Sequence, residues 1–480
     1  MADDVVSEEK VVPSDVIDPG ELPPLKFKDL PEPIAWKQMI GPSILILGAS
    51  IGSGEYVLWP YLTAHYGFVI WWACMLGILT QYFVNMEIER WTLATGECSV
   101  ISYCRLSKHW AWAFLLMTAV PWAWPGWATG AARALSFMIG GNHVVYAILG
   151  LIAVGIAISA GPVVYSTVEK LQEVMVVIMI GLSIVFFLIT FKMAAVGAMV
   201  VGTLKVGHIP EGISLPLLLG AIAYAGAGGA LNLAQSNYIR DKGYAMGKYV
   251  GRITSPITGK LEPIPSTGFF FEPTEDNMRK WRGWWRAANW EHFITFFVLG
   301  ALSLILLSLI SYSTVYGLEG LGAGFDFIKN EGMEIGKLYG PLMKNVFWLM
   351  GVFILFTTEL GVMDIVARVC TDIIKVNWMR GSEISDRAVY FIILWIEIGF
   401  GILILLSGIT QPLLLLVIGS CLNGMVMFFY SLLLLWFNNK VIPKHLEMGK
   451  MRFIALVWAS AFYGYFTIAV LRGQIPKLFG

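Results

Sequence analysis

The chain has 480 residues, of which 57% are apolar and only 14% are charged, and its formal net charge is zero. A soluble protein normally carries about a quarter charged residues, so this composition excludes an ordinary soluble globular protein. The balanced charge also gives no reason to expect a nucleic-acid partner.

Long segments with almost no charge recur along the chain, each close to the ~20 residues that an α-helix needs to cross a bilayer. A transmembrane β-barrel would show short alternating segments instead. The sequence therefore predicts an all-α, multi-pass membrane protein of the plasma membrane, with the lipid bilayer as a partner. The apolar windows predict eleven spans, at about 40–66, 67–92, 109–138, 143–161, 168–191, 211–238, 288–315, 343–373, 386–407, 410–437 and 452–471.

Charge at the ends of these segments predicts their orientation. Residues 1–38 are polar, acidic and proline-bearing, which is typical of a flexible tail. Lys and Arg gather before the first span and after spans 2, 6, 8 and 10. By the positive-inside rule the N-terminus is expected in the cytoplasm, and eleven spans then place the C-terminus outside.

A weak internal repeat relates the first and sixth spans. The stretch LILGASIGSGE, residues 45–55, is echoed by LLLGAIAYAGAGG, residues 217–229. An offset of five spans turns the two copies in opposite directions across the bilayer. This pattern is typical of transporters with inverted repeats, whose paired, interrupted helices form the substrate site. The repeats are expected at 39–195 and 205–437, with a cytoplasmic loop at 239–287, an extracytoplasmic loop at 316–342, and a last helix with the C-terminus at 438–480.

The glycine-rich stretches predict interruptions of both helices near the middle of the membrane. An interrupted helix frees backbone carbonyls, which is tolerated where they are buried in protein or line a watery cavity. Glu55 adds a full negative charge at the first break, where an acid costs about 2.5–3.5 kcal/mol to insert. Both features suit a positively charged ligand. The predicted substrate-binding residues are Ala49, Gly52, Ser53, Gly54 and Glu55 in the first span, and Ala223, Tyr224, Gly226 and Asn232 in the sixth.

Other interpretations stay open for the first span and for polar residues of the eighth and tenth spans. The glycines of the first span also suit close helix packing, with Glu55 at the outer interface. In the eighth and tenth spans, Thr358, Glu359 and Asn423 are predicted to form a coupling or second site. Glu359 could instead pair with Arg133 as a structural ion pair, and Asn423 could serve as an interhelical hydrogen-bond donor.

Residues 41–83, GPSILILGASIGSGEYVLWPYLTAHYGFVIWWACMLGILTQYF, and LATGE at residues 93–97 carry a family resemblance. They resemble the first helices of the Nramp (natural resistance-associated macrophage protein) family of divalent metal transporters. The resemblance extends more weakly to about span 10. It implies a LeuT-type fold of two inverted five-helix repeats plus one further helix, within the amino acid–polyamine–organocation superfamily.

The departures from that family lie at its functional positions. Its Asp-Pro-Gly-Asn ligand stretch corresponds to Gly52, Ser53, Gly54 and Glu55, and its carbonyl ligand falls on Ala49. Its Met-Pro-His stretch corresponds to Gly226–Gly228, and two acids of its proton route correspond to Trp124 and Trp127. The resemblance therefore implies Glu55 as the metal ligand and puts proton coupling in doubt. Without the soft thioether, hard cations such as Mg²⁺ or Ca²⁺ are favoured over Mn²⁺ or Fe²⁺.

The leading hypothesis is a secondary-active, alternating-access transporter of a divalent metal ion. One alternative is a transporter of a small amine or amino acid on the same fold, with Glu55 pairing its amine. Another is a non-transporting sensor or assembly subunit. The sequence holds no nucleophile–base pair, phosphate loop or HExxH-type helix, so neither an enzyme nor a cofactor is expected. Direction of flux and oligomeric state stay open.

Overall fold

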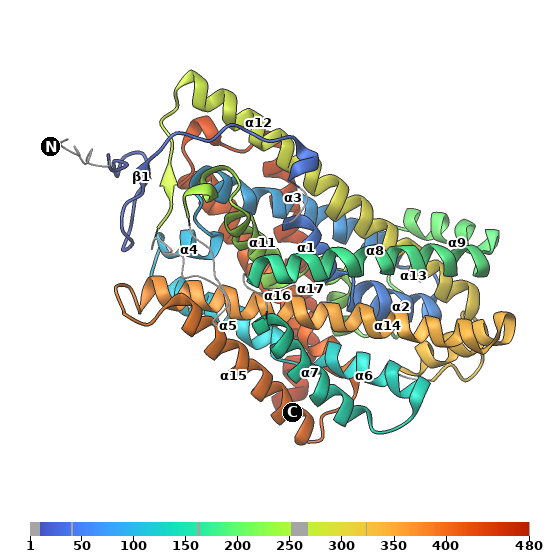
Figure 1. Ribbon diagram of the computed structural model, residues 1–480. Helices are drawn as coiled ribbons and strands as arrows, with labels where there is room; N and C mark the ends of the chain where they lie inside the picture. The colour runs from blue at the N-terminus through green and yellow to red at the C-terminus, as the bar shows by residue number, and fades with distance from the viewer. Residues whose placement is uncertain (1–9, 40–41, 161–163, 251–266, 323, 480) are drawn as a thin grey trace.

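The fold is a bundle of long helices with almost no strand, described here from a computed structural model (Figure 1). The structure describes residues 10–39, 42–160, 164–250, 267–322 and 324–479. The helices of the first half are α1 Pro42–Ser50, α2 Trp59–Tyr66, α3 Trp71–Thr95, α4 Ser99–Cys104, α5 His109–Trp122, α6 Gly126–Ile139, α7 His143–Ala160, α8 Val164–Thr190 and α9 Met193–Leu204.

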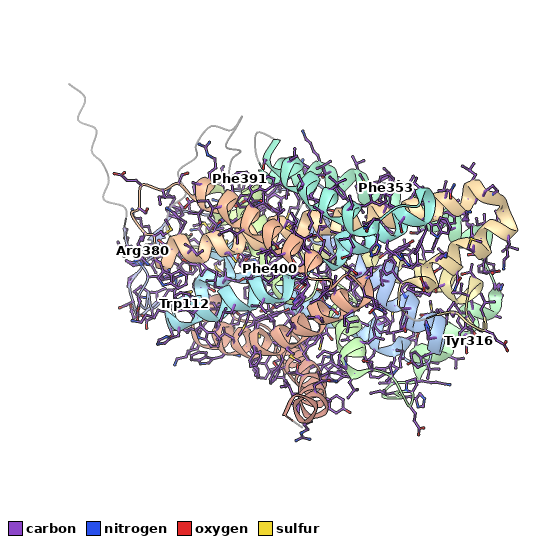
Figure 2. All side chains as sticks on the ribbon, turned by 90° about the horizontal axis from the view of Figure 1, so that it is seen from below. Trp112, Tyr316, Phe353, Arg380, Phe391 and Phe400 are labelled. Carbon is purple, nitrogen blue, oxygen red and sulfur yellow. The ribbon has the colours of Figure 1, made fainter. Side chains whose placement is uncertain are left out.

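The second half continues the bundle. Its helices are α10 Leu215–Ala223, α11 Gly229–Lys242, α12 Glu275–His292, α13 Leu299–Thr314, α14 Asp326–Asn377, α15 Asp386–Leu406, α16 Pro412–Lys440 and α17 Lys450–Phe479. α12 and α13 are joined by the π-helical turn Phe293–Val298, and α14 is kinked at Gly340, whose φ is +88°. Figure 2 shows the two ends of the bundle, with Trp112 and Arg380 at one end and Tyr316 at the other.

Six helices in the described part of the chain are long and apolar enough to cross a membrane. They are Val168–Thr190, Glu275–Thr314, Asp326–Asn377, Asp386–Leu406, Pro412–Lys440 and Lys450–Gln474. The apolar helix His143–Ser159 is shorter, and the predicted spans 1, 3 and 6 are divided into two helices each. These observations confirm the predicted helical membrane fold, while the count of eleven spans stays a prediction.

The division of span 3 was not predicted. α5 ends at Trp122 and α6 begins at Gly126, directly after Pro125. Proline has no N–H to donate to the preceding turn and restricts the residue before it, so a helix tends to end there. This break lies beside the other two and brings two tryptophan side chains toward them.

Residues 10–38 differ from the predicted flexible tail. β1, Lys26–Phe27, pairs in parallel with β2, Phe269–Phe270, and Leu30 donates its N–H to Asn277 of α12 at 3.0 Å. Apolar side chains are spaced through this polar stretch and are buried, namely Val12, Ile17, Leu22, Leu25 and Leu30. Burial of that surface holds the segment against the bundle. Residues 1–9 lie outside the described residues.

The predicted loops also contain regular structure. In the 239–287 stretch, α11 continues to Lys242, a short 3₁₀ turn spans Ala245–Tyr249, and α12 begins at Glu275. Residues 251–266 of this loop lie outside the described residues. In the 316–342 stretch, α14 already begins at Asp326. A further 3₁₀ turn, Lys444–Leu446, precedes α17.

A buried ion-pair network joins α11 to α14. Arg240 contacts Asp241 at 2.8 Å and Asp372 at 2.7 Å, while Arg368 contacts Asp364 at 2.8 Å and also pairs with Asp241. Arg368 is fully buried. Because each charge has an opposite neighbour, the network can be buried without an isolated ion.

We expect Arg368→Gln to lower the free energy of unfolding by about 3–5 kcal/mol, because it removes the guanidinium partner of buried Asp364 and one of the two guanidinium partners of buried Asp241. Thermal unfolding of the purified protein checks this. The matched control is Arg380→Gln, since Arg380 is exposed and donates hydrogen bonds to the Val376 carbonyl of the preceding turn. Equal losses in the two variants would contradict a structural role for the network.

Candidate functional site

The first span is broken immediately before the predicted acid. α1 ends at Ser50, and Gly52 has φ −153° and ψ −110°, outside helical geometry. A π-helical turn, Ser53–Leu58, then leads into α2. A Cβ on Gly52 would lie 2.0 Å from the Thr358 hydroxyl oxygen, so only glycine allows α14 to approach this closely. The predicted interruption of span 1 is confirmed.

The sixth span is broken over Tyr224–Gly228, between α10 and α11. Gly228 and Gly229 have φ of +75° and +51°, the left-handed region that glycine adopts without a steric penalty. A Cβ on Gly229 would lie 1.7 Å from the Asn423 side-chain oxygen. Both the conformation and the contact therefore require glycine, and the predicted interruption of span 6 is confirmed.

The two breaks touch each other. A Cβ placed on Gly54 would lie 1.6 Å from the carbonyl oxygen of Tyr224, so the backbones of the two spans meet without an intervening side chain. Just beyond the first break, the indole N–H of Trp59 donates to the Ala221 carbonyl at 2.8 Å. The glycines of the two stretches thus serve one close contact between opposed spans.

Glu55 lies at this contact and is fully buried. One carboxylate oxygen accepts the N–H of Gly52 at 3.1 Å, as a capping acid does at the start of a helix. The other, Oε1, has no hydrogen-bond partner among the described residues. A buried carboxylate oxygen normally has a partner, because desolvation without one costs several kcal/mol. The side chain faces the interior, which argues against an acid at the outer interface.

Hydroxyl and aromatic side chains surround Ser53. The indole N–H of Trp127 donates to the Ser53 hydroxyl at 3.1 Å. The ring of Trp127 lies 5.3 Å from that of Trp122 and 6.0 Å from that of Tyr224, and Trp122 stacks on Tyr224 at 5.6 Å between centroids. Asn423 donates to the Tyr224 hydroxyl at 3.0 Å. Three rings from spans 3 and 6 therefore lie beside the first break.

The two predicted residues of the eighth span, Thr358 and Glu359, have different contacts. Thr358 donates to the Ile51 carbonyl at 3.3 Å and contacts the first break directly. Glu359 is also buried, but one of its oxygens accepts the N–H of Ala128 at 3.0 Å, in the first turn of α6. Arg133, the alternative partner, forms its ion pair with Asp326 at 3.7 Å. Glu359 therefore caps the second half of span 3 and forms no hydrogen bond with the described residues of the first break.

The remaining predicted residues lie at the edge of this cluster. The Asn232 amide donates to the Tyr430 hydroxyl at 2.7 Å, on α16. The Ala223 carbonyl accepts a bond from Gln81 at 2.8 Å, and Gly226 packs against the same side chain. Ala49 lies in α1, and its side chain is outside the described ones. Gly52–Glu55, Tyr224, Thr358 and Asn423 are thus brought together, and Asn232 and Glu359 face other partners.

Gln81 is a residue that the sequence analysis missed. Its amide bridges the broken sixth span, because the nitrogen donates to the Ala223 carbonyl and the oxygen accepts the Gly228 N–H at 3.0 Å. It supplies the bonds that the interrupted helix cannot make internally. The one signal for it in the sequence is a lone amide in the apolar run WWACMLGILTQYF, residues 71–83.

The site has few side chains that could bind a metal ion. Within the described residues no three His, Cys, Asp or Glu side chains lie close enough together to hold a metal ion. The oxygen groups around the breaks are the Glu55 carboxylate, the hydroxyls of Ser53 and Thr358, and backbone carbonyls. Such hard oxygen ligands bind alkaline-earth ions and ammonium groups rather than soft transition metals.

Known proteins share this fold. No protein-family model and no curated protein sequence matches the chain. A solved mutant of the manganese transporter from Eremococcus coleocola has a TM-score of 0.68 at 12% identity, over 98% of this chain and 92% of that one. The same transporter in complex with an aromatic bis-isothiourea substituted compound gives 0.68 at 11% identity over the same shares.

A second transporter has a similar fold. MhsT in complex with L-phenylalanine has a TM-score of 0.52 at 14% identity, over 91% of this chain and 98% of that one. At these identities the likeness concerns the fold. The chain therefore has the LeuT-type fold of membrane transporters that the sequence predicts, and the resemblance to Nramp proteins is supported at the level of the fold.

We expect Gln81→Leu to lower the free energy of unfolding by about 2–4 kcal/mol, because it leaves one buried carbonyl and one buried N–H unpaired. Chemical unfolding of the purified protein measures the loss. Gln81→Glu, which keeps the acceptor for the Gly228 N–H, should lose less. A leucine variant as stable as the unchanged protein would show that the amide does not hold the break.

Proposed function

We propose that the chain is a secondary transporter that moves a small cation across the membrane by alternating access, and that Glu55 is the charged group that holds the cation. The observation that carries this proposal is the buried Glu55 carboxylate, with Oε1 unpartnered where the two broken spans meet. Acids inside membrane proteins normally mark ion or substrate pathways. Broken helix pairs are the usual place for such a site.

The first candidate cargo is a hard divalent cation such as Mg²⁺ or Ca²⁺. Near Glu55 the site offers the hydroxyls of Ser53 and Thr358 and the carbonyls of Ile51 and Tyr224. Mg²⁺ commonly keeps several waters and takes only one or two carboxylates, which suits a site with a single acid. The manganese transporter with the same fold supports the class of cargo, while the carboxylate, hydroxyl and carbonyl oxygens at the breaks favour a harder ion.

We propose transport without the proton route of Nramp proteins. The positions that correspond to its acids hold Trp124 and Trp127, and the indole N–H of Trp127 is engaged by Ser53. An indole nitrogen donates one hydrogen bond and accepts none, so it does not relay protons.

We also propose that the N-terminus lies in the cytoplasm and that the two inverted repeats span residues 39–195 and 205–437.

A second candidate cargo is an organic ammonium ion, such as a small amine or an amino acid. The observation in its favour is the group of Trp122, Trp127 and Tyr224 rings beside Ser53. Ring faces attract ammonium groups by about 0.5–2 kcal/mol, and a nearby carboxylate adds to that attraction. MhsT, solved with L-phenylalanine, shows that this fold accommodates an amino acid.

We expect Glu55→Gln to weaken binding of the transported cation at least tenfold, or about 1.4 kcal/mol, because a charged ligand becomes neutral. Calorimetric titration of purified protein with a panel of metal ions and amines measures the affinities. Glu319→Gln, which neutralises an exposed acid outside the site, is the matched control and should leave them unchanged. Unaltered affinity in the Glu55 variant would remove the assigned site.

The Trp122→Leu variant separates the two cargoes. It removes one ring face without changing charge, so ammonium binding should weaken about fivefold while metal affinity stays the same. Uptake into proteoliposomes, measured with the cation that binds, then tests transport itself. Binding without uptake would favour the sensor or assembly subunit over a transporter.

A further inference from the structure

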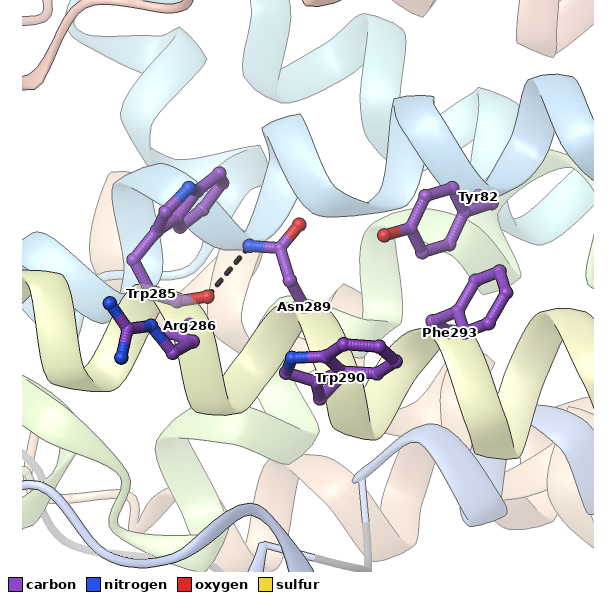
Figure 3. A pocket seen from close by; sticks show the side chains of 6 residues that line it. All are labelled: Tyr82, Trp285, Arg286, Asn289, Trp290 and Phe293. Carbon is purple, nitrogen blue, oxygen red and sulfur yellow. Dashed lines mark hydrogen bonds between the residues drawn. The ribbon is translucent and has the colours of Figure 1, made fainter.

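A groove lies along α12, with one side formed by α3. It has a volume of about 440 Å³ and is lined by Tyr82 of α3 and by Trp285, Arg286, Asn289, Trp290 and Phe293 (Figure 3). That volume is within the range of sites that hold small organic ligands. None of the six lining residues is acidic.

The groove lies where the chain passes from polar to strongly apolar sequence. α12 is rich in Arg and Trp, and it continues through Phe293–Val298 into the apolar α13. Trp290 is 52% exposed, an unusual degree for so large an apolar side chain in an aqueous setting. Tryptophans at such a transition are typical of the membrane–water interface.

Positive charge surrounds the polar end of the groove. Arg286 is exposed and forms no ion pair within the described residues. Two further guanidinium carbons lie over the Trp285 ring, that of Arg90 at 4.1 Å and that of Arg452 at 4.9 Å. Both of these arginines share one carboxylate, Glu87, at 2.8 Å and 3.3 Å. Of these three arginines, Arg286 is the one without a carboxylate partner within the described residues.

The geometry points to a site for an anionic phospholipid, with its phosphate on Arg286 beside Trp285 and an acyl chain along Tyr82, Trp290 and Phe293. Figure 3 shows Trp290 and Phe293 along the α12 side and Tyr82 opposite, with Arg286 at the other end. The aromatic side chains can pack against the acyl chain of the lipid. The guanidinium of Arg286 can donate a pair of N–H groups to the phosphate oxygens. The predicted cytoplasmic side is also where anionic lipids gather.

A second feature makes this end of the groove rigid. Asn289 donates to the Trp285 carbonyl at 2.6 Å and accepts a bond from Arg452 of α17. The groove is lined by α3, by α12 and by Phe293 of the following turn, and Arg452 fixes the Asn289 side chain from α17. A bound lipid would add contacts between α3 and α12, so it should stabilise the folded protein by mass action.

The test uses the full chain, purified and depleted of lipid. Native mass spectrometry and thermal unfolding are followed during titration with phosphatidylglycerol, phosphatidylcholine or inorganic phosphate. We expect phosphatidylglycerol to bind and to raise the unfolding temperature. Arg286→Gln should weaken that binding about fivefold, as expected for one surface arginine, and Arg286→Lys should restore part of it, because lysine keeps the charge but not the paired donors.

Arg380→Gln is the control, because it removes an exposed arginine that does not line the groove. It should leave phosphatidylglycerol binding unchanged, and unfolding without lipid shows whether each variant is folded. Equal binding of phosphatidylcholine, or equal loss in the two glutamine variants, would overturn the proposal. Binding of inorganic phosphate with the same dependence on Arg286 would overturn the assignment to a lipid.

Discussion

The backbone contact between the two broken spans is the constraint on which the rest of the site depends. Gly54 lies against the Tyr224 carbonyl with no room for a side chain. Interrupted helices inside a membrane leave peptide groups that water cannot reach, so each must find a partner in the protein. Glu55, Gln81 and Thr358 supply several of these partners. Glu55 Oε1 has no such partner among the described residues, and in the proposed function it is the atom that holds the cation.

The surrounding helices hold this contact in place. α3 contributes Gln81, α6 contributes Trp127, α14 contributes Thr358 and α16 contributes Asn423. These side chains come from both predicted repeats. In alternating access one group of helices moves against another, and contacts that cross between them must break and reform. The hydrogen bonds around the two breaks are of the modest strength that permits such exchange.

The local features of the site could be predicted from the sequence, because glycine runs and an acid in apolar sequence act through the chain nearby. Both interruptions and the position of Glu55 follow from them. The roles of Gln81 and Trp127 could not, since each bonds to a residue far along the chain, at Ala223 and Ser53. Such pairs depend on how helices pack, which a single sequence does not specify.

The contrast between local sequence features and long-range contacts also explains where else the structure adds to or differs from the prediction. Residues 10–38 read as a tail because their polar composition dominates, yet a few of their apolar side chains are buried, and Leu30 also bonds to Asn277 of α12. Glu359 is predicted at a coupling or second site because it is an acid within a span, and the structure adds that one of its oxygens accepts the Ala128 N–H at the break before α6. The prolines near that break were visible in the sequence. Their effect on a neighbouring helix was not.

An experimental density map of the protein, determined with the tightest-binding cation present, tests the central claim most directly. The account predicts additional density beside Glu55 Oε1, at about 2.0–2.6 Å for a metal ion or about 2.7–3.2 Å for an ammonium nitrogen. The cation should lie between Gly52–Glu55 and the Tyr224 carbonyl. Density for the cation elsewhere, with Glu55 turned toward the lipid headgroups, would contradict the account.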